Sequence, residues 1–265
     1  MRTLFLSLLL LAGLLQTQGQ TIPSFEKRWL IHNQDTLPYR VQYPLNYKPS
    51  RKYPLLLFLH GAGERGNDNN FQLFWGADLF ADPVNRMNFP AIVIFPQCAS
   101  ADYWANVKRV PKSPTQSRDS LLFPSDLPAR PSLSMVQRLV DSLIQNKIVQ
   151  ARRIYLGGLS MGGMGTFELL WRMPGTFAAA FPICGGGDPA QAPLYGSTTA
   201  IRIFHGSEDI VVDPMCSRLM YQALKQAGAD VQYTEYPGVG HDSWKKAFAE
   251  PDFLPWIFAQ RKKRK

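Results

Sequence analysis

The sequence predicts one α/β domain built on a mostly parallel sheet, and three observations support this prediction. Several apolar runs are continuous rather than alternating, which is typical of strands buried on both faces. Segments with helical periodicity separate these runs along the chain. The chain has 265 residues, of which 45% are hydrophobic and 18% charged. This composition allows one sizeable core and excludes a disordered or coiled-coil chain.

The predicted elements alternate along the chain. Two short strands are expected around a turn at Asn33–Asp35. Continuous apolar strands are expected within 52–61, 91–97, 153–158, 177–187, 200–206 and 230–238. Helices are predicted over 132–147, 161–173 and 215–228, with two further short helices in WKKAFAE and FLPWIFAQ. Residues 98–131 contain five prolines and show no period, so we expect a long loop over the carboxyl edge of the sheet, where such folds bind ligands.

The first 19 residues have the pattern of a secretory signal peptide. Arg2 precedes an apolar run over residues 4–15, followed by QTQGQ. This run is shorter than the ~20 residues that a membrane-spanning helix needs. We therefore expect a signal peptide over 1–19, a single catalytic domain over 20–260 and a secreted or periplasmic protein. An uncleaved anchor is the alternative.

The formal net charge of +9 suggests an acidic partner until the charges are located. The basic run RKKRK at 261–265 carries five of them and the signal segment one, which leaves 23 basic residues against 20 acidic ones. The sequence therefore predicts a basic tail rather than a basic face. A solvated terminus is favoured over adhesion to anionic polymers or lipid head groups. We expect neither a nucleic-acid partner nor stable insertion into a membrane.

The strongest chemical signal is Gly158-Leu159-Ser160-Met161-Gly162, which follows a predicted strand and opens a predicted helix. This context makes the G-x-S-x-G pattern informative. Flanking glycines allow strand and helix to approach closely through a sharp turn. The turn exposes the Ser160 hydroxyl at the edge of the sheet, as a nucleophile requires.

A nucleophilic serine needs a base and an acid. Of four histidines, His241 follows the last predicted strand in a loop with two glycines, near the carboxyl edge of the sheet. Asp209 follows the preceding strand and can orient an imidazole. Asp213 precedes a proline and is expected to cap the next helix. The other histidines are expected to lie far from the site or to shape turns: His32, His60 and His205.

The loop HGAGERGNDNN at 60–70 is rich in small residues that leave backbone N–H groups exposed. We expect an oxyanion hole formed by the N–H groups of Ala62 and Met161, with Gly63 as the alternative to Ala62. The loop does not open a G-x-G-x-x-G helix, so a dinucleotide site is rejected. Neither a metal nor an organic cofactor is implied.

Together the motifs FLHGAGERGNDN, FPQC, GLSMGGMGTFELL, PICGGGD, HGSED and EYPGVGHDSW resemble the α/β-hydrolase superfamily over residues 35–258. Within it they are similar to secreted carboxylesterases of the polyhydroxybutyrate depolymerase, feruloyl esterase and dienelactone hydrolase groups. These are also grouped as small prolyl oligopeptidase-family hydrolases. The resemblance implies an eight-stranded, mostly parallel sheet in the order 1-2-4-3-5-6-7-8 with helices on both faces. It also implies Ser160 as nucleophile, Asp209 as acid and His241 as base.

The chain departs from the family pattern at one position, and the implied strand order has one consequence for the cysteines. Asp213 stands where relatives commonly have proline, so it is a competitor of Asp209 for the histidine. The implied strand order separates Cys98 from Cys184 by about 14 Å, which exceeds the ~7 Å reach of a disulfide. A bridge between Cys184 and Cys216 is less excluded, but we expect three free, buried thiols.

The sequence thus predicts a secreted serine carboxylesterase that hydrolyses short-acyl or aromatic esters through an acyl-enzyme. Acetyl or feruloyl groups on plant polysaccharide are candidate substrates. Trp104 and Trp244, with Tyr103, are expected to form an aromatic wall for the substrate. The alternatives are a serine peptidase of the prolyl oligopeptidase family, a phospholipase or polymer depolymerase, and an inactive binding protein on a hydrolase scaffold.

Overall fold

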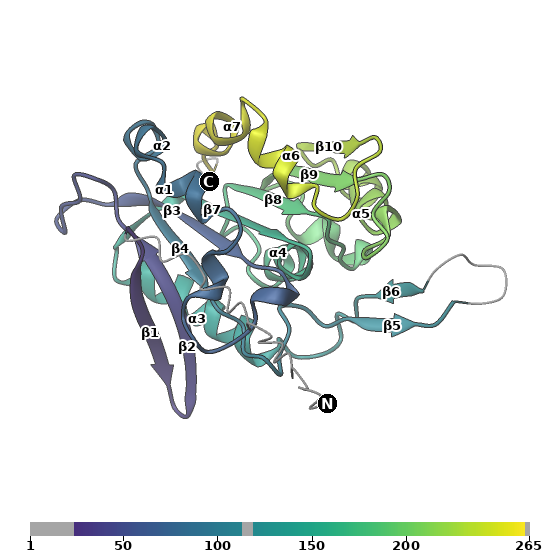
Figure 1. Ribbon diagram of the computed structural model, residues 1–265, viewed down its shortest axis with the longest axis horizontal. Coiled ribbons are helices and arrows are strands. Elements are labelled where there is room, and N and C mark those ends of the chain that lie inside the picture. Colours follow the sequence, from purple (N-terminus) through teal and green to yellow (C-terminus); the bar gives the residue numbers. More distant parts are fainter. Residues whose placement is uncertain (1–23, 113–118, 263–265) are drawn as a thin grey trace, which may run out of the picture.

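Eight strands form one mixed sheet in the computed structural model, which describes residues 24–112 and 119–262 (Figure 1). Their order is β1-β2-β4-β3-β7-β8-β9-β10. The strands are β1 Glu26–His32, β2 Asp35–Gln42, β3 Tyr53–Leu59, β4 Ile92–Pro96, β7 Val149–Leu159, β8 Ala179–Ile183, β9 Ala200–Gly206 and β10 Val231–Tyr236. Strand β2 pairs antiparallel with β1 and β4, and all other neighbours are parallel. The predicted fold class and strand order are confirmed.

Helices connect the strands at the predicted places. They are α1 Ala77–Ala81, α2 Pro83–Asn88, α3 Pro131–Gln145, α4 Met161–Arg172, α5 Pro214–Gln226, α6 Trp244–Ala249 and α7 Phe253–Ala259, with 3-10 turns η1 Ala62–Glu64, η2 Phe71–Leu73 and η3 Pro189–Leu194. The helices α1 and α2 were not predicted, because five or six residues are too few to show a period. As predicted, the Asp213 carboxylate caps α5 by accepting from the Met215 N–H at 2.9 Å.

Strand β3 is continuously apolar because both faces of the sheet are covered at this strand. Leu55, Leu57 and Leu59 belong to the core beneath α3, α4 and α5. Leu56 and Phe58 belong to the opposite core, with side chains of α1, α6 and α7. All five side chains are fully buried. Because successive residues of a strand face opposite sides, only a strand covered on both faces needs an unbroken apolar sequence.

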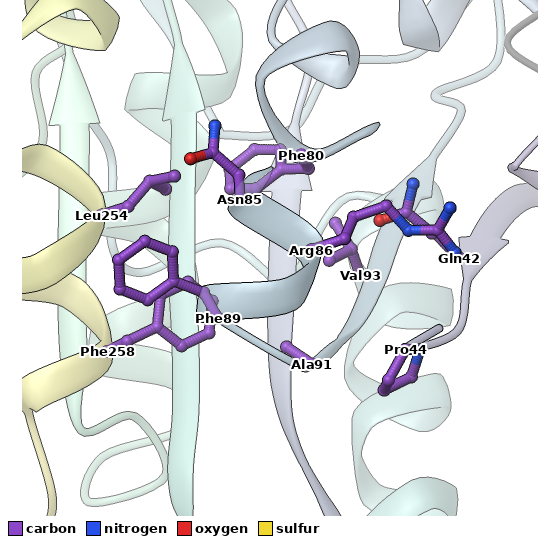
Figure 2. A pocket seen from close by; sticks show the side chains of 10 residues that line it. All are labelled: Gln42, Pro44, Phe80, Asn85, Arg86, Phe89, Ala91, Val93, Leu254 and Phe258. Carbon is purple, nitrogen blue, oxygen red and sulfur yellow. The ribbon is translucent and has the colours of Figure 1, made fainter. Parts of the chain in front are cut away.

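The opposite core is closely packed where α2 meets α7. Figure 2 shows Asn85 of α2, and Phe89 directly after that helix, beside Leu254 and Phe258 of α7. The rings of Phe89 and Phe258 stack with centroids 5.2 Å apart. The remaining space is about 10 Å³, the size of a single water site. This region is therefore core and not a ligand pocket.

The stretch 98–131 was expected to be a loop, and this expectation is wrong in part. It contains the antiparallel hairpin of β5 Lys108–Val110 and β6 Ser120–Leu122, which extends away from the main sheet in Figure 1. The base of this arm packs Val107 and Leu121 against Met164 and Val212. Three-residue strands interrupted by prolines are too short to show an alternating pattern, which is why the sequence did not indicate them.

The expected signal peptide and residues 263–265 of the expected tail lie outside the described residues. The folded domain extends past its predicted end at residue 260, because the Lys262 N–H donates to the Arg152 carbonyl at 3.0 Å. The Arg152 guanidinium in turn donates to the Lys262 carbonyl. No helix in the described ranges is long and apolar enough to span a bilayer. The three cysteines are free, as expected: Cys98 and Cys184 are buried and Cys216 is half-buried.

Candidate active site

Ser160 lies in a sharp turn between β7 and α4. Its backbone has φ 54° and ψ −118°, a conformation that is uncommon for a residue other than glycine. Such strain is of order 1–3 kcal/mol and persists only where the surroundings enforce it. Here the Ser160 N–H donates to the Ile183 carbonyl of β8 at 2.9 Å. The turn therefore holds Ser160 at the carboxyl ends of the central strands.

The two glycines that flank Ser160 permit a close approach of β3, β7 and α4. A Cβ atom on Gly162 would lie 2.7 Å from the His60 carbonyl oxygen and closer still to that of Leu59. A Cβ atom on Gly158 would also lie 2.7 Å from the Leu59 oxygen. These neighbours are backbone atoms that cannot rotate away. The spacing of the motif therefore has a steric cause.

The structure brings Ser160, His241 and Asp209 together from three separate segments. Ser160 Oγ lies 2.9 Å from His241 Nε2, and His241 Nδ1 lies 2.7 Å from Asp209 Oδ2. Asp209 follows β9 and is fully buried, whereas the His241 side chain, between β10 and α6, is 21% exposed. With Nδ1 donating to a carboxylate, Nε2 is left to accept the serine proton. This is the geometry that a nucleophile, base and acid require.

Asp209 is held ionised by several donors. Its Oδ1 accepts from the N–H groups of Val211 at 2.8 Å and Val212 at 2.9 Å. Its Oδ2 faces His205 Nε2 at 3.1 Å in addition to His241. Burial by itself would raise the pKa of Asp209, but the hydrogen bonds from His205, His241 and Val212 outweigh it and hold that pKa well below its usual range. The carboxylate therefore remains charged beside the imidazole.

His205 is the one neighbour of Asp209 whose role the sequence analysis missed. The ring is fully buried, and its Nδ1 lies 2.7 Å from Ser217 Oγ. The Ser217 hydroxyl in turn donates to the Gly185 carbonyl at 3.0 Å. The sequence did contain a signal for this contact, because Asp209 follows His205 by four residues at the end of a strand. We expected only a turn-shaping histidine there.

The predicted oxyanion donors lie at the starts of two helical turns. Ala62 begins η1 and Met161 begins α4. The first N–H groups of a helix have no acceptor within that helix, so both groups are available to a ligand. The loop lies against the serine, since a Cβ atom on Gly61 would be 3.7 Å from Ser160 Cβ. Arg65 Nε donates to the Ala62 carbonyl at 3.0 Å and supports the loop from behind.

His60 orients the peptide that carries the Ala62 N–H. Its Nδ1 lies 2.6 Å from the Gly61 carbonyl, and its Nε2 accepts from the Cys98 N–H at 2.9 Å. Burial lowers the pKa of His60 to about 4, so the ring is neutral with its proton on Nδ1. The Gly61 carbonyl and the Ala62 N–H share one trans peptide and point in opposite directions. Holding the carbonyl therefore aims the N–H.

The two tryptophans expected to contact substrate have different surroundings. Trp104 is fully buried and donates its indole N–H to the His60 carbonyl at 3.1 Å, so its prediction as a substrate-contacting residue is wrong. A buried indole needs such an acceptor, and His60 supplies it. Trp244 is 7% exposed and packs edge to face on the His241 ring, with centroids 5.4 Å apart. It supports the histidine from the side.

Within the described ranges, Cys184, Asp209 and His241 gather ligand-type atoms within 4.8 Å of one another. Burial raises the pKa of the Cys184 thiol, which opposes the thiolate that metal binding needs. The Nδ1–Oδ2 separation of 2.7 Å is a hydrogen-bond distance. The cluster therefore suits proton transfer better than metal coordination.

Comparison with known families decides the wider assignment. The model of a family described as phospholipase/carboxylesterase matches residues 46–251. The chain belongs to this phospholipase/carboxylesterase family. The order of its sheet and the turn at Ser160 agree with this membership and with the α/β-hydrolase superfamily.

Three known proteins are similar to the chain. Acyl-protein thioesterase 1 of Neurospora crassa is 32% identical over 129 residues, which cover 44% of this chain and 53% of that protein. A bifunctional acetylxylan esterase/xylanase of Neocallimastix patriciarum is 25% identical over 178 residues, or 65% of this chain and 21% of that protein. The crystal structure of a thermostable esterase is 34% identical with a TM-score of 0.77, covering 91% of this chain and 64% of that one. The chain spans about half the thioesterase and a fifth of the xylanase.

Proposed function

We propose that this protein is a secreted serine carboxylesterase that cleaves short-acyl or aromatic esters, including acetyl or feruloyl groups carried by polysaccharides. Ser160, His241 and Asp209 are its nucleophile, base and acid. The observation that carries the proposal is the hydrogen-bonded series from Asp209 through His241 to Ser160, at 2.7 and 2.9 Å. The short apolar segment at residues 4–15 supports export.

The geometry supports the following order of proton transfers. His241 Nε2 removes the proton of Ser160 Oγ as the oxygen attacks the ester carbonyl. The N–H groups of Ala62 and Met161 bind the developing oxyanion. His241 then protonates the departing alcohol, which leaves an acyl group on Ser160. A water molecule deprotonated by His241 attacks this acyl-enzyme and releases the acid. Asp209 stays ionised throughout and stabilises the transient imidazolium.

The rim of the site supports an apolar acyl group. Ile210 and Val211 directly follow Asp209 and are 85% and 54% exposed. Leu122 of the hairpin arm is 50% exposed, and the base of that arm packs against Val212. Large apolar side chains exposed together beside a catalytic site commonly mark a binding surface. These exposed apolar side chains favour a short acyl or aromatic group.

The acetylxylan esterase relative supports acetyl groups on a polysaccharide as substrate. A thioester is the second candidate, because the thioesterase relative is 32% identical over its matched segment. Thioester and ester hydrolysis pass through the same acyl-enzyme on Ser160 and differ only in the leaving group. A panel of acetyl, feruloyl and long-chain esters, acyl thioesters and peptide amides distinguishes these substrates.

Ser160→Ala tests the assignment. Hydrolysis of a chromogenic acetate ester should fall by at least about 10³-fold, while circular dichroism and the melting temperature stay close to those of the wild type. A fluorophosphonate probe should label the wild type and not the variant. Ser142→Ala on the exposed side of α3 is the matched control and should keep both activity and labelling. Full activity or labelling in a folded Ser160→Ala protein would refute the assignment.

A further inference from the structure

Two adjoining hollows lie at the amino end of the sheet. The larger has a volume of about 690 Å³ and the smaller about 430 Å³, and both are lined by Arg152 and Arg261. Residues 196–200, which we call the 196–200 wall, and Gly228 are among the residues that line the larger hollow. We call the two together the basic hollow. A volume of this size is in the range that ligand sites occupy.

The lining of the basic hollow is strongly cationic. One carboxylate, Asp230, is among the lining residues. The basic residues are Lys52, Lys147, Arg152, Arg153, Arg261 and Lys262. Concave surfaces lined by one sign of charge concentrate the field and attract ions of the opposite sign.

This distribution differs from the expectation that the basicity lies in a tail. The described ranges contain 24 basic and 20 acidic residues. Six of those basic residues and one acidic residue line the basic hollow, so the rest of the described surface is almost neutral. The six basic residues come from four separate segments of the chain. Only the fold brings them together into a face.

Two of the cations are held in place without a carboxylate. Arg153 donates to the Phe258 carbonyl and to the Tyr155 hydroxyl. Arg152 donates to the Lys262 carbonyl at 2.9 and 2.6 Å. Among the described residues neither guanidinium is in an ion pair with an acidic side chain. Their orientation is fixed and their charge is uncompensated, as a preformed anion site requires.

The basic hollow is remote from the ester-cleaving site. Arg152 and Ser160 stand eight residues apart on β7 and the turn that follows it. At ~3.3 Å per residue along a strand they are about 26 Å apart, at opposite ends of the sheet. A ligand in the hollow is therefore a second contact and not part of the scissile ester.

We propose that the basic hollow binds an acidic polysaccharide, through carboxylate or sulfate groups on the basic side chains and sugar hydroxyls on the 196–200 wall. No Phe, Trp or Tyr is among its lining residues, all of which are described. Single-stranded nucleic acid would need aromatic rings for base stacking. A membrane surface would need a flat or protruding face with apolar side chains to insert. A hydrophilic acidic glycan needs neither.

The test measures binding to ester-free polygalacturonate, so that hydrolysis plays no part. The charge-removing variant carries Lys52→Gln, Lys147→Gln and Arg261→Gln, and circular dichroism checks its fold. We expect its Kd for polygalacturonate to rise by about tenfold at 50 mM salt. Neutral dextran should not bind either protein. The Ser160→Ala variant should bind as tightly as the wild type, because this inference does not depend on the proposed function.

Two control variants remove the same number of charges elsewhere. One carries Lys108→Gln, Lys112→Gln and Lys246→Gln, and the other replaces the three basic residues at 263–265 by glutamine. Each should change the Kd by less than about twofold. Equal weakening in all three variants, or loss only in the 263–265 variant, would overturn the proposal. So would tighter binding to phosphatidylserine vesicles or single-stranded DNA than to polygalacturonate at equal salt, or no binding to polygalacturonate.

Discussion

Acidification should destabilise the protein through His60, the residue that aims the oxyanion peptide. Burial lowers the pKa of His60 from 6.5 to about 4. Between these values the unfolded chain binds a proton that the folded protein does not, so the free energy of unfolding falls as the pH falls from about 6.5 to about 4. An interval of about 2.5 between the two pKa values corresponds to about 3 kcal/mol, because each pKa unit is worth about 1.4 kcal/mol. Above pH 6.5 both states are neutral and the loss is absent.

Urea unfolding of the wild type and of His60→Gln at pH 7 and pH 4 measures this contribution. At pH 7 the variant should be less stable, because it lacks the hydrogen bonds to Gly61 and Cys98. From pH 7 to pH 4 the wild type should lose about 3 kcal/mol more unfolding free energy than His60→Gln, since the variant has no imidazole at position 60 to protonate. The difference in unfolding free energy between the two proteins should therefore be smaller at pH 4 by this amount. Trp104→Phe is the control: it removes the indole N–H that donates to His60 and no titratable group. Its difference from the wild type should be the same at both pH values.

A gap between wild type and His60→Gln that stays constant from pH 7 to pH 4 would refute this account of His60. The functional counterpart is also measurable. A protonated Nε2 cannot accept the Cys98 N–H, so acid should loosen the loop that carries Ala62 before it unfolds the domain. The wild type should therefore lose activity at a higher pH than His60→Gln, which keeps the same base His241, while the far-ultraviolet circular dichroism signals of both are still intact.

Two further substitutions test the packing of the site. Gly162→Ala places a methyl group against the Leu59 and His60 carbonyls, so it should lower the free energy of unfolding by about 2 kcal/mol and kcat/KM by about 100-fold. Gly240→Ala is the control, because its added Cβ meets no atom within 4 Å. It should keep the wild-type free energy of unfolding in urea and the wild-type kcat/KM in ester assays. Trp244→Ala removes the ring beside His241 and should lower kcat about tenfold with little change in KM, whereas Trp244→Phe should restore most of it in steady-state kinetics.

The predicted catalytic residues meet because their positions follow from the topology. Ser160, Asp209 and His241 each lie within five residues of the end of a parallel strand, and the carboxyl ends of parallel strands share one edge of the sheet. A pattern that identifies strand ends therefore identifies the neighbours at that edge. His205 was missed because it lies within β9, and only the turn after this strand brings the Asp209 carboxylate back to its ring.

Trp104 shows where position in the chain is not enough. It follows β4 in a segment without a period, so exposure was expected. In the structure Gly165 of α4 leaves the room into which the indole turns, and the His60 carbonyl accepts its N–H. Whether a loop side chain faces solvent or core depends on the space and the acceptors that other segments supply.

The sequence by itself determined the fold class, the serine turn and the members of the candidate triad, because periodicity and glycine spacing are local properties of the chain. The strand order followed from the family resemblance of its motifs. The tertiary structure alone decided the burial of Trp104, the second imidazole on Asp209 and the gathering of six basic side chains at the amino end of the sheet. Burial and charge clustering depend on which distant segments meet. A net charge counted along the chain cannot show them.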